Sequence, residues 1–426
     1  MMSRLLALLA LACTQPMSAQ EVAPNVLIIV IDDVAAVDLN GLALPSLEGL
    51  KAQGVTFTRA YANPTCAPSR RSLQTGRFWV DGNGEPCAIP APHTPALSEV
   101  FLPEAMPGYS SAILGKWHLG VDPSGGPLEC APLRQGYDYW LRGSLSNVGA
   151  TSCEGVDGYD YDLWEMVTAG PLGCSRVPFG TYQPFAVSER FVQAWGTAPE
   201  PRMAVVNLQL CHSPFHRPPA YLLPPGYPAT TSLRQKYEAM IVAHDALIGW
   251  MLTAVDLART TVIVIGDNGT PPQVAGLEAQ RAKGTTFERG VRVPMIIAGK
   301  GVVDPGRLEG ALVHAVDVFA TAVALAGGTS TSDGLSLVPA MEHESQPEHA
   351  FVLVGARWET PDGDVASVSA DGYKLRELDP DGDGVADSLE FYDLSTDPSE
   401  ILNLVDAPEQ AARVSAHQAF LSATIP

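Results

Sequence analysis

One short stretch of the chain combines a nucleophilic side chain with two cationic ones. Cys66 is followed closely by Arg70 and Arg71, and Pro68 and Ser69 lie between them. Proline suits the first turn of a helix because it lacks the N–H that has no partner there, and serine can serve the same unpaired donors. We therefore expect Cys66 at the N-terminus of a helix, where the helix dipole and the arginines would attract an anion.

Oxygen-bearing side chains follow two apolar runs of sequence. The run that starts at Asn25 ends in Asp32 and Asp33, and the run 260–265 leads to Asp267 and Asn268. Such runs are typical of parallel strands buried on both faces, and open α/β sheets bind ligands at the carboxyl ends of these strands. Adjacent buried carboxylates are costly unless a cation neutralises them. An all-oxygen set of ligands favours calcium or magnesium over zinc.

Further cationic and imidazole side chains lie in conspicuous contexts. Lys116 and His118 are two residues apart in the segment GKWHLG, and alternation along an extended segment would place both on one face. His212 follows a third apolar run, 203–210. The chain is acidic, so an anionic substrate would need a locally basic pocket of this kind.

Four segments resemble motifs of the type I sulfatases. Residues 66–77 meet the signature C-x-P-S-R-x-x-L-x-T-G-R at every specified position. The segments around Lys116, His212 and Lys283 resemble further sulfatase motifs, with Arg289 in place of a glycine in the last of them. Because a glycine there would permit a positive φ, Arg289 is the departure that could alter this loop.

The resemblance implies a cofactor set and a mechanism. Cys66 would be oxidised to formylglycine by a formylglycine-generating maturation enzyme, the hydrated aldehyde would be the nucleophile, and Arg70 would hold it. His212 or Lys283 would stabilise or protonate the departing alcohol oxygen, and His118 would accept a proton when sulfate is expelled. The implied catalytic residues are Cys66, Arg70, Lys116, His118, His212 and Lys283, and the implied calcium ligands are Asp32, Asp33, residue 66, Asp267 and Asn268.

The implied function is hydrolysis of a sulfate ester on a small molecule or glycan, with sulfated carbohydrate as the expected class. Two alternatives stay open. One is a phosphate or phosphonate ester hydrolase of the same alkaline phosphatase-like superfamily, because formylglycine chemistry can serve both. The other is a non-catalytic glycan-binding protein in which Cys66 stays a thiol.

Composition and the N-terminus limit the partners and the location. With 426 residues, 46% hydrophobic residues and a net charge of −21, we expect a globular protein that binds neither nucleic acid nor an anionic membrane. Arg4, an apolar run and small residues near position 19 predict a signal peptide over residues 1–20, and hence a secreted or periplasmic protein. Lipoprotein anchoring through Cys13 is the less favoured alternative, and no other stretch could cross a bilayer.

The region between residues 121 and 185 is rich in Gly, Pro, Tyr and Cys and shows little periodicity. We expect a loop insertion over the active-site face, which would decide the choice of substrate. In an oxidising compartment Cys87, Cys130, Cys153 and Cys174 could form two disulfides in any of three pairings.

The order of apolar runs and helical patterns predicts an α/β protein with two units. The resemblance implies an alkaline phosphatase-like catalytic domain over residues 21–344, with a mostly parallel central sheet flanked by helices. Residues 345–426 would form a small α+β unit, with an antiparallel sheet and a covering helix.

An acidic loop within the small unit has the oxygen pattern of an EF-hand loop. Carboxylates occupy positions 1, 3, 5, 9 and 12, and glycine occupies position 6. The flanks read as strands, so this is either an isolated structural calcium loop in a hairpin or a solvated acidic hairpin. Its carboxylates are Asp379, Asp381, Asp383, Asp387 and Glu390.

Overall fold

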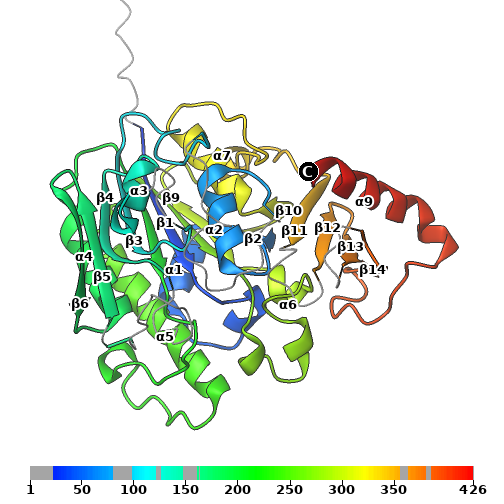
Figure 1. The fold of residues 1–426 in the computed structure, drawn as a ribbon, viewed down its shortest axis with the longest axis horizontal. Coiled ribbons are helices and arrows are strands. Elements are labelled where there is room, and N and C mark those ends of the chain that lie inside the picture. Colours follow the sequence, from blue (N-terminus) through cyan, green and yellow to red (C-terminus); the bar gives the residue numbers. More distant parts are fainter. Residues whose placement is uncertain are drawn as a thin grey trace, which may run out of the picture.

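The computed structural model describes residues 23–79, 98–120, 126–146, 161–162, 164–355, 363–379 and 385–425. Two sheets organise these residues, one of ten strands and one of four, with the smaller sheet to one side (Figure 1). The large sheet is mixed but mostly parallel, and the small sheet is antiparallel, which confirms the predicted fold class. Among the described helices, none is long and apolar enough to cross a membrane.

The large sheet has the strand order β10-β2-β9-β8-β1-β7-β3-β4-β5-β6. Its central strand β1 pairs in parallel with β7 and β8, and all seven of its residues are buried. The strands are β1 (Asn25–Ile31), β2 (Gly54–Tyr61), β3 (Ser110–Lys116), β4 (Tyr139–Ser144), β5 (Trp164–Gly170), β6 (Gly173–Phe179), β7 (Arg202–Leu208), β8 (Thr260–Gly266), β9 (Met295–Gly299) and β10 (Arg307–His314).

Helices cover both faces of this sheet because successive residues of a strand point to opposite faces. In β1, Leu27 and Ile29 belong to one hydrophobic core and Val26 and Ile28 to the other. Helices α1, α4 and α5 pack in the first core, and α2, α7 and α8 contribute to the second. The bounds are α1 (Pro45–Ala52), α2 (Cys66–Thr75), α3 (Ala131–Arg134), α4 (Gln183–Trp195), α5 (Leu233–Leu252), α6 (Glu288–Val291), α7 (Val316–Leu325), α8 (Val338–Met341) and α9 (Ala411–Thr424).

The described part of the 121–185 region is more regular than the sequence suggested. Strands β4, β5 and β6 extend the large sheet at one edge, so the expectation of an irregular loop insertion is wrong for these residues. Short strands that end in glycine or include a proline obscured the pattern. A disulfide joins Cys130 to Cys174 on β6, which selects one pair among the possible connectivities. Cys87 and Cys153 lie outside the described residues.

The small sheet consists of β11 (Phe351–Gly355), β12 (Val365–Ser369), β13 (Tyr373–Leu378) and β14 (Ser388–Asp393), and α9 packs on it. The sequence did not indicate β12, because its buried residues include Ser367 and Ser369 and so break the apolar pattern. The Ser367 hydroxyl lies 2.7 Å from Nδ1 of His417 on α9, which satisfies a polar group inside this small core.

Further predictions fall wholly or partly outside the described residues. The predicted signal peptide, 1–20, is one of them. Asp381 and Asp383 of the acidic loop also lie outside, whereas Asp379, Asp387 and Glu390 are described. Glu390 forms an ion pair with Arg376 on the neighbouring strand β13.

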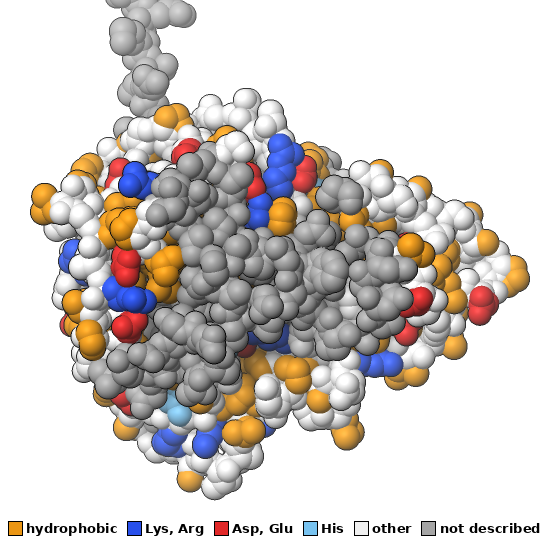
Figure 2. All heavy atoms as spheres, in the orientation of Figure 1, with side chains coloured by type: hydrophobic (Ala, Val, Ile, Leu, Met, Phe, Trp, Pro, Cys, Tyr) orange, Lys and Arg blue, Asp and Glu red, His pale blue; other side chains and the backbone are white. Residues whose placement is uncertain are grey.

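On the described surface shown in Figure 2, Lys and Arg side chains lie singly or in small groups among acidic and hydrophobic ones. The described part of this face therefore carries side chains of mixed charge.

Candidate active site

Helix α2 begins at Cys66, as predicted, and its first residue is 5% exposed. Thr65 is the N-cap residue but its side chain makes no capping hydrogen bond. The expected role of Ser69 is wrong: its hydroxyl donates to the carbonyl oxygens of Asn63 and Thr65 instead of accepting from the helix N–H groups. The helix ends at Thr75, and the following residue, Gly76, adopts a left-handed conformation with φ 66° against the ring of Phe319.

The four predicted oxygen-bearing residues meet at one end of the sheet. Because Ile31 of β1 is in register with Gly266 of β8, the next residues along the two strands, Asp32 and Asp267, emerge beside each other. One ligand atom from each of Asp32, Cys66 and Asp267 lies within 4.8 Å of the others. The N-terminus of α2 therefore lies against the carboxyl ends of β1 and β8.

Asp33 connects the two strand ends by hydrogen bonds. Its Oδ1 accepts from Nδ2 of Asn268 at 2.8 Å and from Nζ of Lys283 at 2.5 Å. Its backbone N–H donates to Oδ1 of Asp267 at 3.1 Å. The backbone of Asp33 has φ 61°, a conformation that aspartate tolerates better than bulky residues.

Three cations surround Cys66 and these carboxylates. Nζ of Lys116 lies 2.8 Å from Oδ2 of Asp32, and Nη2 of Arg70 lies 2.8 Å from Oδ2 of Asp267. Nζ of Lys283 lies 3.7 Å from Sγ of Cys66. The side chains of Lys116 and Arg70 are 0% and 3% exposed, whereas that of Lys283 is 17% exposed. Lys283 is thus on the accessible side of the cluster.

The surroundings shift the pKa values of the three carboxyl groups in different directions. Although burial opposes ionisation, Lys116 and Arg70 hold the pKa of Asp32 well below its ordinary value. Burial raises the pKa of Asp33 despite the nearby Lys283. Burial together with the charge of Asp32 raises the pKa of Asp267 to about 6. Burial thus opposes ionisation of all three carboxyl groups, and at Asp33 and Asp267 it outweighs the attraction of the nearby cations.

Two oxygen atoms at the centre of the cluster are suited to a metal ion. Within the described residues, the buried Oδ1 of Asp32 and the buried Oδ1 of Asn268 have no hydrogen-bond partner. Buried polar atoms are almost always satisfied, and a cation with oxygen ligands would satisfy both. The donor set therefore fits calcium, with Asp32, Asp33, Asp267 and Asn268 available to hold it.

His212 lies beyond the end of β7 and faces the same cluster. Its Nε2 is 3.9 Å from Oδ2 of Asp33, and its Nδ1 is 2.8 Å from the carbonyl oxygen of Ser213. A carbonyl oxygen only accepts, so Nδ1 carries the proton and Nε2 is the acceptor of the neutral ring. Burial and the charge of Lys283 lower the pKa of His212 to about 3. Lys283 is therefore the protonated group of this pair.

Tyr161 also contributes to this corner of the site. Its hydroxyl donates to the carbonyl oxygen of His212 at 2.7 Å. The sequence does not indicate this role, because nothing in the pattern around Tyr161 links it to a segment 51 residues away.

The structure does not place Lys116 and His118 on one extended face. Strand β3 ends at Lys116, and His118 has φ 57°, so the alternation assumed from the sequence stops between them. The predicted shared face of Lys116 and His118 is therefore wrong. The catalytic role assigned to His118 stays a prediction.

Arg289 does not disturb the loop in which it replaces a glycine. It lies within the helical turn α6, so no positive φ is required at this position. The next residue, Gly290, needs to be glycine, because a Cβ there would lie 2.1 Å from the carbonyl oxygen of Thr285. Arg289 pairs with Glu278 and with Asp38, a buried carboxylate that the sequence analysis did not single out.

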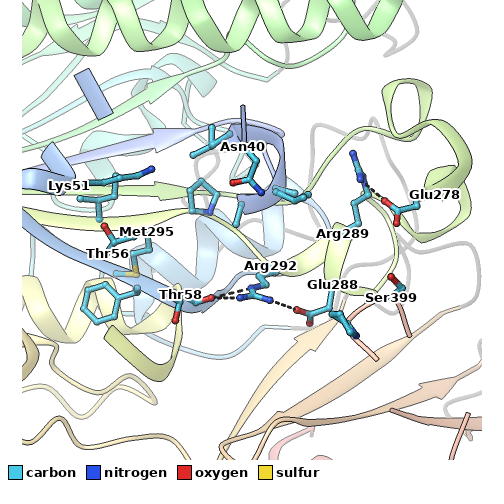
Figure 3. A pocket seen from close by; sticks show the side chains of 18 residues that line it. Asn40, Lys51, Thr56, Thr58, Glu278, Glu288, Arg289, Arg292, Met295 and Ser399 are labelled. Atoms are coloured by element: carbon cyan, nitrogen blue, oxygen red, sulfur yellow. Dashed lines mark hydrogen bonds and ion pairs between the residues drawn. The ribbon is translucent and has the colours of Figure 1, made fainter. Parts of the chain in front are cut away.

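A cavity of about 500 Å³ lies apart from Cys66 and is shown in Figure 3. Arg289 and Arg292 line it, but Arg289 pairs with Glu278, and Arg292 pairs with Glu288 and the carbonyl oxygen of Thr58. These arginines are engaged by the protein itself, so this cavity is not the candidate anion site.

Comparison with known proteins identifies the family of this chain. The sulfatase family model matches residues 24–328, and the chain belongs to the sulfatase family. It is 30% identical to N-acetylgalactosamine-6-sulfatase of Homo sapiens over 75% of this chain and 66% of that protein. The chain thus spans just under two thirds of the length of that relative.

Two further relatives extend the comparison. Arylsulfatase A of Bos taurus is 28% identical over 91% of this chain and 85% of its own length. The crystal structure of Ps i-CgsB in complex with k-i-k-neocarrahexaose superimposes with a TM-score of 0.75 at 21% identity, covering 94% of this chain and 92% of the other. This likeness shows that the two proteins share a fold.

Proposed function

We propose that this protein is an exported sulfatase that hydrolyses sulfate esters of carbohydrates. The observation that carries the proposal is the arrangement around Cys66, where Lys283, Lys116 and Arg70 converge with carboxylates from two strand ends. A pocket of this kind can bind a tetrahedral anion although the whole chain is acidic, because the relevant charge is local.

Residue 66 and the metal site would supply the two parts of the chemistry that unmodified side chains lack. Conversion of Cys66 to formylglycine would supply a nucleophilic hydroxyl group in the hydrated form. Calcium held by Asp32, Asp33, Asp267 and Asn268 would supply a Lewis acid for a sulfate oxygen. Burial raises the pKa of the unmodified Cys66 thiol, which makes the thiol itself a poor nucleophile here.

The other side chains of the site differ in exposure, and we assign their roles accordingly. Arg70 and Lys116 are the least exposed cations of the cluster. Their positive charges stabilise the negative charge of the carboxylates and of residue 66. Lys283, which is protonated and partly accessible, donates a hydrogen bond or proton to the departing alcohol oxygen. His212 presents the acceptor atom Nε2 beside Asp33, where it can accept a hydrogen bond from a hydroxyl group of the bound carbohydrate and orient it.

The names of the relatives support carbohydrate as the substrate class. One is named for a 6-sulfated N-acetylgalactosamine, and the structural neighbour holds a neocarrahexaose. Strands β4, β5 and β6, the described strands of the region 121–185, form one edge of the large sheet beside α4. The region 121–185 stays our candidate for the choice of sugar.

The most direct test combines mass spectrometry with a comparison of substrates. After coexpression with a formylglycine-generating enzyme, we expect the peptide that spans residues 60–77 to carry formylglycine at residue 66. The purified protein should hydrolyse an aryl sulfate faster than the matching aryl phosphate. A clear preference for the phosphate would instead favour the phosphate or phosphonate ester hydrolase. An unmodified thiol with no hydrolysis of either compound would favour a glycan-binding protein.

A further inference from the structure

We infer that the C-terminal sheet positions Lys283 through the backbone and hydroxyl group of Thr286, with Lys374 and Arg376 of β13 as positioning residues. This inference rests on the role proposed above for Lys283. It assigns the small sheet a task in the reaction itself, separate from any contact that it makes with a substrate.

Lys374 reaches from the small sheet into the loop that carries Lys283. Its side chain is 0% exposed, and its Nζ donates to the carbonyl oxygen of Thr286 at 2.9 Å. The same nitrogen lies 2.8 Å from Oε1 of Glu288 and 2.9 Å from Oε1 of Glu400. The ammonium group thus ties the loop to two carboxylates.

Arg376 and Asp364 hold the rest of Thr286. Nε of Arg376 donates to Oγ1 of Thr286 at 2.9 Å, and Nη2 of Arg376 lies 2.7 Å from Oδ2 of Asp364. That carboxylate oxygen accepts from the backbone N–H of Thr286 at 2.9 Å and from its hydroxyl at 2.6 Å. The guanidinium group also lies 3.6 Å from the centre of the Phe287 ring. Every polar group of Thr286 is therefore engaged by the small sheet or the residues that lead into it.

The other side of the loop is fixed to the catalytic sheet. The N–H of Lys283 donates to the carbonyl oxygen of Thr270 at 2.8 Å, close after Asp267 and Asn268. The N–H of Gly284 donates to the carbonyl oxygen of Pro64 at 2.9 Å, two residues before Cys66. Residues 283–286 consequently connect the cluster of carboxylates and cations around Cys66 to the small sheet. A shift of Thr286 would therefore move Nζ of Lys283 relative to residue 66.

The buried charges at this junction favour a positioning role over a purely stabilising one. Asp364 and Arg376 are each 1% exposed, and Lys374 is 0% exposed. Replacing well-packed apolar groups by buried ion pairs adds little net stability, because desolvation offsets the attraction. Charged hydrogen bonds do impose direction, however, and so restrict the loop to one geometry.

The test compares two variants of Thr286. Thr286→Val removes the hydroxyl group but keeps the shape of the side chain, whereas Thr286→Ser keeps the hydroxyl group. We expect Thr286→Val to lower kcat on a small aryl sulfate by about 10- to 100-fold. We also expect faster hydrogen exchange at the amides of Lys283 and Gly284, while Thr286→Ser stays near wild type in both measurements. The control is Thr321→Val in α7, which removes another fully buried hydroxyl, one that bonds to Asp317 and Leu337.

A double-mutant cycle with Lys283→Ala separates positioning from general destabilisation. If Thr286 acts through Lys283, Thr286→Val lowers kcat in the wild type but has little further effect in the Lys283→Ala protein. Equal losses in both backgrounds, or unchanged exchange at the Lys283 and Gly284 amides, would overturn the inference. Wild-type turnover by Lys283→Ala would instead reject the proposed role of Lys283, while amide exchange would still decide whether the small sheet fixes this loop.

Discussion

Nζ of Lys283 lies 3.7 Å from Sγ of Cys66, although 217 residues separate them in the sequence. Lys283 is the cation of the cluster that combines a short distance to residue 66 with partial exposure. In the proposed mechanism, residue 66 is the nucleophile and Lys283 is the neighbouring cation that a substrate can reach.

We predict that Cys66→Ser loses turnover of an aryl sulfate by about 10⁴-fold or more, because a serine hydroxyl cannot replace the proposed modified residue. The fold should persist, since serine is slightly smaller than cysteine and the site is already polar. Turnover and thermal unfolding of the purified variant check both statements. Activity near wild type would contradict the proposed mechanism.

Removal of calcium should abolish turnover, and adding it back should restore activity. We expect Asn268→Ala to raise the calcium concentration for half-maximal activity by about 10-fold or more, because it removes one of the two unsatisfied central oxygens. Calcium titration of activity in chelator-treated protein measures this effect.

The matched control for the calcium titration is Asn403→Ala. Its side-chain oxygen accepts backbone hydrogen bonds from Phe391 and Val405 in the small unit, away from the cluster. Asn403→Ala should keep the wild-type calcium dependence even if it unfolds more easily. Equal calcium dependence in Asn268→Ala and the wild type would argue against the assigned ligands.

Arg289→Gly should destabilise the protein by about 1–3 kcal/mol, because it leaves the buried Asp38 with one cationic partner fewer. Arg289→Ala removes the same ion pairs but favours the helical backbone of α6. We therefore expect the glycine variant to be no more stable than the alanine variant in urea unfolding. The reverse order would show that position 289 needs the conformational freedom of glycine.

Stability should fall on mild acidification, partly because of His417. Burial lowers the pKa of His417 from 6.5 to about 4, so between these values the unfolded chain binds a proton that the folded protein does not. The free energy of unfolding then falls as the pH falls from about 6.5 to 4, by up to about 1.4 kcal/mol per pH unit for one such histidine.

Replacing His417 by glutamine tests this linkage. Glutamine can keep a hydrogen bond to Ser367 but cannot be charged, so His417→Gln should reduce the pH dependence by about the contribution of one histidine. Urea unfolding at several pH values between 4 and 7 measures the slope. An unchanged slope would show that His417 does not contribute to the pH dependence.

Much of the fold and of the candidate site could be predicted from local sequence. The apolar runs that became β1, β7 and β8 are buried on both faces, so their hydrophobicity is continuous and easy to recognise. Polar side chains of the cluster come within a few residues of the end of each run, because the carboxyl ends of parallel strands lie at one edge of the sheet. The start of helix α2 at Cys66 was equally local, since a proline near the first turn marks it.

Other features depended on contacts between distant segments. Strand β12 was hidden because its buried serines are satisfied by partners such as His417, which only the folded chain brings near. The left-handed backbone of His118 breaks the alternation expected between Lys116 and His118, because residue pattern alone does not specify a turn at this position.

The sequence alone determined which side chains are available for chemistry, because residue types and their positions after buried strands are properties of the chain. Only the tertiary structure decided how they are arranged: Asp33 bonded to both Asn268 and Lys283, and Lys283 tied through Thr286 to a second sheet. The physical reason is that hydrogen bonds and ion pairs act over a few ångströms, and the partners here lie tens to hundreds of residues apart in the chain.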